Sequence, residues 1–372
     1  MEPVGLYLHI PFCRGKCPYC DFYSLPAEEE RMERYTRALC ARMEAAAARF
    51  PRRAATLYFG GGTPSLLGAE RLCRLISCAG QLFSLRGGEI TLEANPGAVT
   101  AQELRELSAA GVNRVSLGLQ SVAEEETAFL GRRHTLQDVE NAVAWCRAAG
   151  VENISLDLML GLPGQTRETL GRSIGFCAAL EVPHLSAYLL KIEPGTPFAK
   201  NHAERLCPDE DEQAELYLFA AEELERRGWK QYEISNFARP GFEGRHNLTY
   251  WDCREYLGLG PAAHSFLEGK RYFYPRDLEG FLALSGPEMG WVEDGPGGSR
   301  EEYAMLRLRL AEGLRRRDAS ARFGGWDAGE IFCRAEPYVR AGLMAREDDR
   351  LFFTPRGFLL SNSVLARILE CP

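Results

Sequence analysis

The sequence lacks any apolar stretch long enough to cross a membrane. None of its uninterrupted apolar runs approaches the ~20 residues that a spanning helix needs, and its first residues show no sign of a secretory leader. A basic excess is missing too, because 44 Lys and Arg stand against 52 Asp and Glu, for a net charge of −8. We therefore expect a cytoplasmic protein that binds no nucleic acid and inserts into no membrane.

Histidine is also scarce, with six in 372 residues, and neither an internal repeat nor a low-complexity tract is present. Cysteine is plentiful by comparison, with 12. Nine cysteines are scattered and are expected to serve as small buried apolar side chains: Cys40, Cys73, Cys78, Cys146, Cys177, Cys207, Cys253, Cys333 and Cys371. The other three fall within eight residues of each other and need a separate explanation.

Short apolar runs alternate with helical patterns along the first two thirds of the chain. Strands are expected at 5–9, 56–59, 89–93, 114–118, 154–158, 185–189 and, more briefly, 231–234, and helices at 28–49, 66–83, 100–110, 136–149, 166–180 and 209–227. Repeated strand–helix units predict an α/β fold with parallel strands. Six units are too few for an eight-fold barrel, so a partial barrel and an open doubly wound sheet remain. Both gather ligands at the carboxyl ends of their strands.

The pattern changes towards the C-terminus. Gly- and Pro-rich segments over 286–298 suggest a linker, and helices follow at 301–314 and 327–341. A hairpin with its turn at 347–350 and a last helix starting at Thr354-Pro355 complete a small winged-helix-like domain. The expected organisation is a core over 1–240, a connecting segment over 241–290 and a C-terminal domain over 291–372.

The three clustered cysteines are Cys13, Cys17 and Cys20, spaced C-x3-C-x2-C on a loop that leaves the first strand. Thiolates at this spacing can share one centre, and iron–sulfur clusters are held by thiolates. A Cys3His zinc site completed by His9 or another histidine, a disulfide with a spare thiol, and chance clustering are the alternatives.

A glycine-rich loop, Gly60-Gly61-Gly62-Thr63-Pro64, follows the second strand and would let backbone approach a ligand. The order of cysteine loop and glycine loop resembles the radical-SAM superfamily. That resemblance implies a 4Fe–4S cluster on the three cysteines, with S-adenosylmethionine (SAM) on the iron they leave open. An electron passed through the cluster would then cleave the SAM sulfonium and make a 5′-deoxyadenosyl radical.

Further segments, at 91–97, 111–121, 130–132 and 157–166, resemble the branch that contains oxygen-independent coproporphyrinogen III dehydrogenase. By that resemblance the SAM site is lined by Tyr7, Gly61, Gly62, Thr63, Glu93, Gln120, Arg132 and Asp157. Glu93 or Asp157 could accept hydrogen bonds from ribose hydroxyls, and Arg132 could pair with a carboxylate. Taken singly, Gln120 and Arg132 also fit ordinary structural roles.

Two departures separate the chain from that dehydrogenase. Phe22 occupies the position of the enzyme's fourth cysteine, and Cys13 lies too near the start for the enzyme's N-terminal arm. Both features, with segments 246–251, 258–265 and 351–362, resemble a sister family, the heme chaperone HemW. That resemblance implies a radical-SAM partial (β/α)6 barrel that binds heme and delivers it transiently to respiratory apo-proteins. It assigns no catalytic residue, and it leaves peripheral membrane contact and a homodimer open. Coproporphyrinogen decarboxylation and another radical-SAM reaction are the rival functions.

His246 stands beside Tyr250 and Trp251, so it could ligate heme iron while an aromatic ring packs on the macrocycle. Chemistry alone favours a structural histidine satisfied within the fold. The resemblance favours His246 as a heme-binding residue, with His264 as a second candidate.

Overall fold

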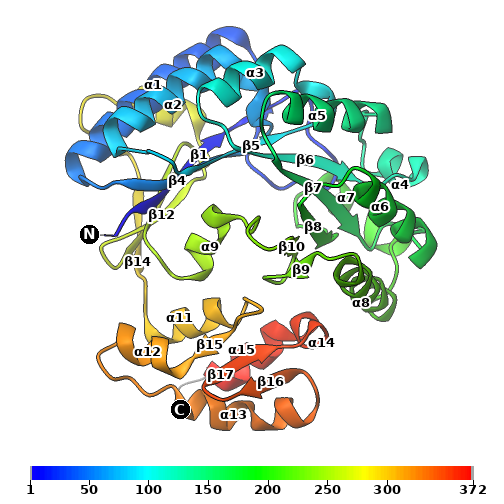
Figure 1. Ribbon diagram of the computed structural model, residues 1–372. Helices are drawn as coiled ribbons and strands as arrows, with labels where there is room; N and C mark the ends of the chain where they lie inside the picture. The colour runs from blue at the N-terminus through cyan, green and yellow to red at the C-terminus, as the bar shows by residue number, and fades with distance from the viewer. Residues whose placement is uncertain (1, 370–372) are drawn as a thin grey trace.

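The computed structural model describes residues 2–369 and contains a long curved sheet with helices on its outer face (Figure 1). Six parallel strands form its centre: β1 (Val4–Ile10), β4 (Ala54–Gly61), β5 (Glu89–Ala94), β6 (Arg114–Gln120), β7 (Asn153–Leu160) and β8 (His184–Leu189). They are neighbours in that order, which confirms the expected partial barrel of six strand–helix units. Their side chains are buried on both faces, as the apolar runs predict.

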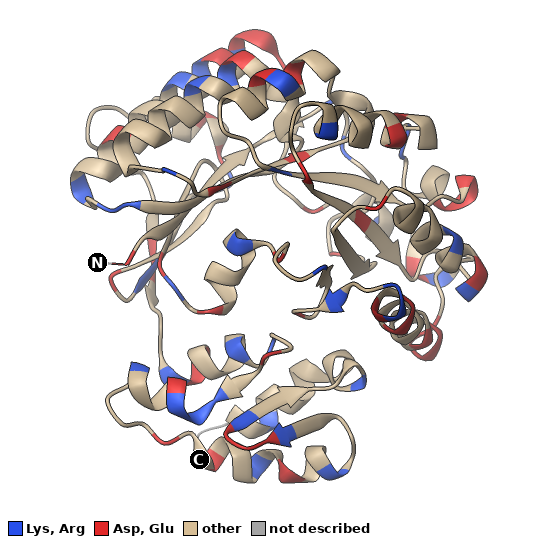
Figure 2. Ribbon diagram, in the orientation of Figure 1, with Lys and Arg blue, Asp and Glu red and all other residues tan. Residues whose placement is uncertain are grey.

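Helices cover the convex side of the sheet (Figure 1). They are α1 (Glu29–Arg49), α2 (Ala69–Phe83), α3 (Ala101–Ala109), α5 (Leu136–Ala148), α6 (Arg167–Ala179) and α8 (Glu210–Arg226). The connections also contain α4 (Glu124–Phe129), α7 (Pro197–Lys200) and the short 3₁₀ helices η1 (Pro64–Leu67), η2 (Pro96–Ala98) and η3 (Ala203–Leu206). Capping boxes at Thr100, Thr135 and Asp209 fix where three of them begin. Both signs of charge are interspersed on these outer helices (Figure 2).

Short strands extend both edges of the sheet. On one side are β11 (Tyr256–Leu259), which runs parallel to β1, and then the antiparallel β12 (His264–Leu267), β13 (Lys270–Phe273) and β14 (Val292–Pro296). On the other are β10 (Asn236–Ala238) and β9 (Lys230–Gln231). Helix α9 (Arg245–Trp251) lies on the concave side of the sheet, and α10 (Leu278–Ala283) packs against α1 (Figure 1).

Two local expectations were wrong here. The strand expected at 231–234 ends at Gln231, because the chain turns back through 232–235 to pair β9 with β10. The stretch expected to be a linker contains β14, which pairs with β13; an edge strand tolerates Pro296 because its N–H need not join the ladder. Residues 241–290 supply α9, α10 and three strands of the sheet.

The C-terminal unit carries a three-stranded sheet among helices. Its elements are α11 (Arg300–Arg307), β15 (Leu314–Arg315), α12 (Arg316–Arg322), α13 (Gly329–Arg340), β16 (Met344–Glu347), β17 (Arg350–Phe353), α14 (Pro355–Leu359) and α15 (Ser361–Leu369), with strand order β15-β17-β16. The expected hairpin and the Thr354 cap are confirmed, since the Thr354 side chain accepts from the N–H of Gly357. Its likeness to winged-helix domains stays a prediction.

This unit lies across the open side of the curved sheet (Figure 1). The N–H of Ala311 donates to the carbonyl of Tyr232 over 3.0 Å, and Leu310 forms a β-bridge with Glu233. That bridge accounts for a third difference: the helix expected over 301–314 ends at Arg307, because the residues after it pair with the barrel. Within residues 2–369, no helix combines the length and the apolar character needed to span a membrane.

The scattered cysteines follow expectation only in part. Cys146, Cys177 and Cys253 are buried, Cys333 is exposed, and four are half-buried: Cys40, Cys73, Cys78 and Cys207. Cys371 lies outside the described residues.

Candidate cofactor site at the carboxyl ends of the strands

The loop over residues 11–28, which we call the cluster loop, connects β1 to α1 and carries Cys13, Cys17 and Cys20. A parallel pair of two-residue strands, β2 (Phe12–Cys13) and β3 (Leu25–Pro26), closes its base. All three thiols are half-buried and unbridged. Burial raises the pKa of Cys20, and the nearby thiols of Cys13 and Cys17 raise it further, so the three sulfurs lie within electrostatic reach of each other.

Two kinds of metal centre were considered for these thiols. In a 4Fe–4S cluster each thiolate binds a different iron, so the sulfurs stand apart. Within residues 2–369, no three His, Cys, Asp or Glu side chains lie close enough together to hold a metal ion. His9, considered for zinc, has both ring nitrogens engaged, Nδ1 with Tyr7 Oη at 3.1 Å and Nε2 with the Tyr23 carbonyl at 2.9 Å. A Cys3His zinc site that includes His9 would require one of these two hydrogen bonds to break.

The glycine loop at the end of β4 packs against the base of the cluster loop. The N–H of Gly62 donates to the Ile10 carbonyl over 2.9 Å, and that of Thr63 to the Phe12 carbonyl over 2.8 Å. A Cβ on Gly62 would meet the Phe12 carbonyl oxygen at 2.6 Å, and one on Gly61 the His9 ring at the same distance. Glycine is therefore required at both positions, because the glycine loop packs closely against the Phe12 backbone and the His9 ring. This packing places Thr63 Oγ1 3.5 Å from Cys13 Sγ.

Two carboxyl groups face the interior of the barrel. Glu93, near the end of β5, accepts a 2.7 Å hydrogen bond from Tyr58. Burial raises its pKa to about 7, with a contribution from Asp157. Asp157 on β7 accepts a 3.1 Å bond from Ser116, and burial raises its pKa as well. Each carboxylate can accept hydrogen bonds from a polar ligand. The two groups are close enough that ionisation of one makes ionisation of the other less favourable.

Gln120, the last residue of β6, and Arg132, in the turn after α4, lie next to each other. Gln120 is buried and has a φ of +69°, an uncommon conformation for a residue other than glycine, where the register of β6 on β7 shifts. A Cβ on Gly118 would lie 2.8 Å from Gln120 Nε2 and 3.5 Å from Arg132 Nη2. Arg132 donates to Asn95 Oδ1 at 2.6 Å and to Tyr19 Oη at 2.7 Å.

Arg132 also has a hydrogen-bond donor available to a ligand. Its buried Nε has no partner among residues 2–369, and its guanidinium interacts electrostatically with the Cys17 thiol. A cavity of about 450 Å³ opens beside it, lined in part by Cys17, Thr63 and Asn95. A cation with an unpaired donor beside the Cys17 thiol fits an anionic cluster and the carboxylate of SAM.

Tyr7 and His246 lie deeper in the barrel. The ring of Tyr7 stacks on that of Tyr58 at 6.0 Å and on that of His246 at 6.4 Å. His246 on α9 is 1% exposed, and both of its ring nitrogens are occupied: Nδ1 by Thr56 Oγ1 at 2.7 Å and Nε2 by Tyr250 Oη at 2.6 Å. In this conformation His246 has no free nitrogen for heme iron, and it sits as a structural histidine.

Seven of the eight residues expected around SAM come from β1 and β4–β7 or the loops directly after them, and Arg132 from the turn after α4. Sequence reasoning missed Tyr19, Tyr58 and Asn95, which hold Arg132 and Glu93 in place. Asn95 could have been found, because it follows Glu93 in the segment 91–97 at the end of a strand. Nothing local marks Tyr19 or Tyr58, since their partners are distant in sequence.

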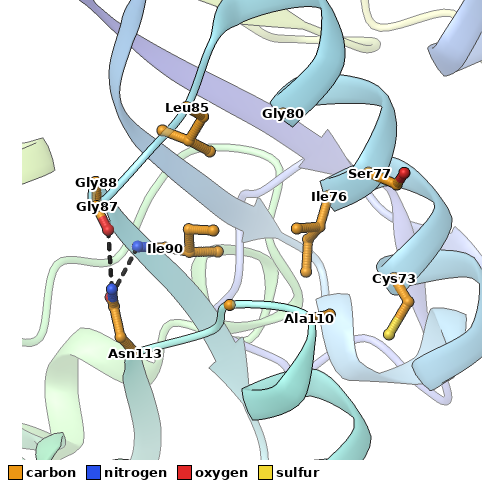
Figure 3. A pocket seen from close by; sticks show the side chains of 11 residues that line it. Cys73, Ile76, Ser77, Gly80, Leu85, Gly87, Gly88, Ile90, Ala110 and Asn113 are labelled. Atoms are coloured by element: carbon orange, nitrogen blue, oxygen red, sulfur yellow. Dashed lines mark hydrogen bonds between the residues drawn. The ribbon is translucent and has the colours of Figure 1, made fainter.

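A second cavity, of about 560 Å³, lies at the opposite ends of the strands (Figure 3). It is lined by residues of α2, by the start of β5 at Ile90 and by Asn113 just before β6. Asn113 closes one side, accepting from the N–H of Ile90 at 2.9 Å and donating to the Gly88 carbonyl at 2.8 Å (Figure 3). It contains none of the residues expected around SAM.

Comparison with known proteins agrees with this geometry. The family model of the radical SAM superfamily matches residues 7–177, and that of the HemN C-terminal domain matches residues 300–360. The chain is 38% identical to the heme chaperone HemW of Mycobacterium tuberculosis, over 99% of this chain and 95% of that one. It is 34% identical to HemW of Escherichia coli, over 99% of both chains.

Among solved structures, the coproporphyrinogen III oxidase HemN of Escherichia coli superposes with a TM-score of 0.84 at 22% identity, covering 98% of this chain and 90% of that one. At that identity the likeness shows a shared fold.

Proposed function

Because the chain belongs to the heme chaperone HemW family of radical-SAM proteins, we propose that it binds a 4Fe–4S cluster, SAM and heme, and passes heme to respiratory apo-proteins. The observation that carries this proposal is similarity to heme chaperones over nearly the whole length, barrel and C-terminal unit alike. Delivery would take place in the cytoplasm through transient contact with the apo-protein, at most peripheral to a membrane. The proposed function is compatible with a homodimer.

The cofactors are assigned to the carboxyl ends of the strands. Cys13, Cys17 and Cys20 would hold the cluster, and the unpaired Nε of Arg132 would offset negative charge beside them. When bound, the cluster supplies an electron to SAM. Around SAM, Glu93 or Asp157 would accept from ribose hydroxyls, while Tyr7, Gly61, Gly62, Thr63 and Gln120 would shape the remaining walls. In this division residues 1–240 serve the cofactors, 241–290 contribute to heme binding, and 291–372 close the barrel.

Anaerobic reconstitution tests the cluster assignment. The wild-type chain should bind about four irons and four sulfides, and Cys20→Ser should bind fewer. Cys333→Ser is the matched control, because Cys333 is exposed on α13, and it should keep the full content. Zinc at full occupancy in place of iron would overturn the assignment.

Two further assays test the chaperone function against its rival. Hemin titration of the reconstituted protein should give a saturable Soret shift, and heme should then move to an apo-protein of respiration. Incubation with coproporphyrinogen III, SAM and a reductant should leave the porphyrinogen unchanged. Formation of protoporphyrinogen would contradict the proposal and identify a dehydrogenase.

A further inference from the structure

A carboxylate is buried where two loops of the candidate SAM site meet. Glu126 belongs to α4 and is 3% exposed. It accepts three hydrogen bonds, from the hydroxyl of Ser121 at 2.6 Å, Nε2 of Gln165 at 3.0 Å and the hydroxyl of Thr169 at 2.7 Å. All three donors are uncharged side chains. A carboxylate is costly to bury unless its hydrogen bonds are made, so these donors account for its place in the fold.

The first of the two loops leads from β6 to α4 and begins after Gln120. Ser121 follows Gln120 directly, and its oxygen also accepts from the N–H of Ala123 at 3.0 Å. Gln120 has a φ of +69°, a conformation that persists in a residue other than glycine only where the surrounding structure holds it. The bond from Ser121 to Glu126 therefore fixes the chain next to a strained residue of the candidate site.

The same helix leads directly to Arg132. With six residues, α4 is too short to hold its own position, so its contacts with neighbouring segments must do so. The carbonyl of Glu126 accepts from the N–H of Leu130 at 3.2 Å, and the carbonyl of Thr127 accepts from the N–H of Arg132 at 3.0 Å. Any displacement of α4 would therefore displace Arg132.

The second loop connects β7 to α6 and contains Gln165. Its amide oxygen accepts from the N–H of Gly161 at 2.8 Å, and its Nε2 donates to the carbonyl of Met159 at 3.0 Å as well as to Glu126. Met159 lies on β7 two residues after Asp157. Through Gln165, the carboxylate joins α4 to the strand that carries Asp157.

An apolar side chain could bury the same face of α4, and a buried carboxylate is weak evidence for added stability. What the carboxylate supplies is convergence, because it gathers donors from three separate segments at one point. We propose that Glu126 is a positioning residue for SAM, which holds Gln120 and Arg132 beside Asp157 in the geometry that receives the ligand. This inference rests on the proposed SAM site. Glu126 acts through these residues and does not itself bind SAM.

Titration of the anaerobically reconstituted full-length chain with SAM, followed by isothermal calorimetry, tests this role. Glu126→Ala should keep the full iron content and raise the Kd for SAM by roughly tenfold. Glu126→Gln keeps the shape and one acceptor oxygen, so it should restore most of the affinity. Ser121→Ala removes one donor and leaves the carboxylate in place. It should give a smaller loss of affinity, and it tests the role even where Glu126→Ala yields too little folded protein.

The matched control is Glu89→Ala. Glu89 is another buried carboxyl group, 4% exposed, and accepts from the N–H groups of Arg245 at 3.0 Å and His246 at 2.9 Å. It is the first residue of β5, so it lies at the end of the strand away from the candidate SAM site. Urea denaturation should show a loss of stability comparable to that of Glu126→Ala, while SAM binds as in wild type.

The outcomes separate this role from the site on which it rests. If the wild-type chain binds no SAM, the proposed SAM site is wrong and the role of Glu126 with it. If wild type binds SAM and Glu126→Ala binds it equally well, the role alone is wrong. An equal loss of affinity in Glu89→Ala would show that lost stability weakens SAM binding, and loss of iron from Glu126→Ala would place the effect on the cluster. Either result would contradict the positioning role.

Discussion

The hydroxyl of Tyr58 donates a 2.7 Å hydrogen bond to Glu93 Oε1 inside the barrel. Without it the carboxyl would be harder to ionise, because burial raises the pKa of Glu93 to about 7 and this bond opposes that rise. The pair therefore sets the pH at which Glu93 becomes a full acceptor for a bound hydroxyl.

Tyr58→Phe should move the pKa of Glu93 further upward. If ionised Glu93 accepts from the SAM ribose, SAM affinity should fall as pH drops through about 7 in the wild type and at a higher pH in the variant. Isothermal titration across this range measures it. Tyr217→Phe is the control, because it removes a buried hydroxyl bonded to Ile234, away from Glu93. Coincident pH profiles for Tyr58→Phe and wild type would contradict the role of Glu93.

The same pKa has a consequence for stability. A carboxyl whose folded pKa exceeds its unfolded value of 4.5 stabilises the fold in its protonated form, so its contribution is lost as pH rises through about 7. Tyr58→Phe should extend that loss to higher pH.

His246→Ala should destabilise the protein by about 3 kcal/mol, because it leaves the hydroxyls of Thr56 and Tyr250 without their partner and opens a buried cavity. Urea denaturation measures the difference. His202→Ala, at an exposed site, should change the free energy of unfolding by less than about 0.5 kcal/mol. Equal midpoints for the two variants would show that the buried bonds contribute nothing.

Acid should weaken the fold through the same histidine. Burial lowers the pKa of His246 from 6.5 to about 3, so the folded state holds it neutral while the unfolded chain takes up a proton below 6.5. Its contribution is complete above that value and declines as pH falls, by about 2 kcal/mol between about pH 7.5 and about pH 5. The pH dependence of unfolding in His246→Ala should be shallower than in wild type by that amount.

Gly62→Ala should lower both stability and cluster content. The new Cβ would lie 2.6 Å from the Phe12 carbonyl oxygen, so the base of the cluster loop must shift, at a cost of about 1–3 kcal/mol. Gly80→Ala is the control, because this helical glycine has open space around it and should be neutral or slightly stabilising. Denaturation and iron analysis read out both variants. Full iron content in Gly62→Ala would show that the loop does not need this contact.

The central strands could be predicted because each is a short run buried on both faces. The expected strands at 114–118 and 154–158 fall inside β6 and β7, and the helix ends follow local caps such as Thr135. The sequence could not show β11 to β14, since strands of four or five residues acquire their conformation from the neighbours they pair with. The end of α11 could not be predicted for the same reason. The local pattern would continue the helix, but Leu310 forms a β-bridge with the distant Glu233.

The candidate site also contains some features that the sequence shows and others that it does not. The spacing of Cys13, Cys17 and Cys20 is local, so one loop revealed them. The state of a histidine is not local. His246 and His264 look alike in sequence, but Thr56, far away in the chain, and the nearer Tyr250 occupy both ring nitrogens of His246. Only the folded chain shows that His246 is buried with both ring nitrogens bonded, while His264 is exposed.

The pairing of β1 with β11 has a consequence for how the chain is made. β1 leaves the ribosome before β4 and can pair with it early, but its other edge remains unpaired until residues 256–259 are made, roughly 250 positions later. At roughly 5–20 residues per second, that edge stays unpaired for on the order of 10–50 s. An apolar strand with open backbone groups is a template for pairing with other chains. Pairing with other chains at this edge of β1 is therefore one route to aggregation of the nascent protein, and a binder that covers the edge during synthesis should raise the yield of folded chains.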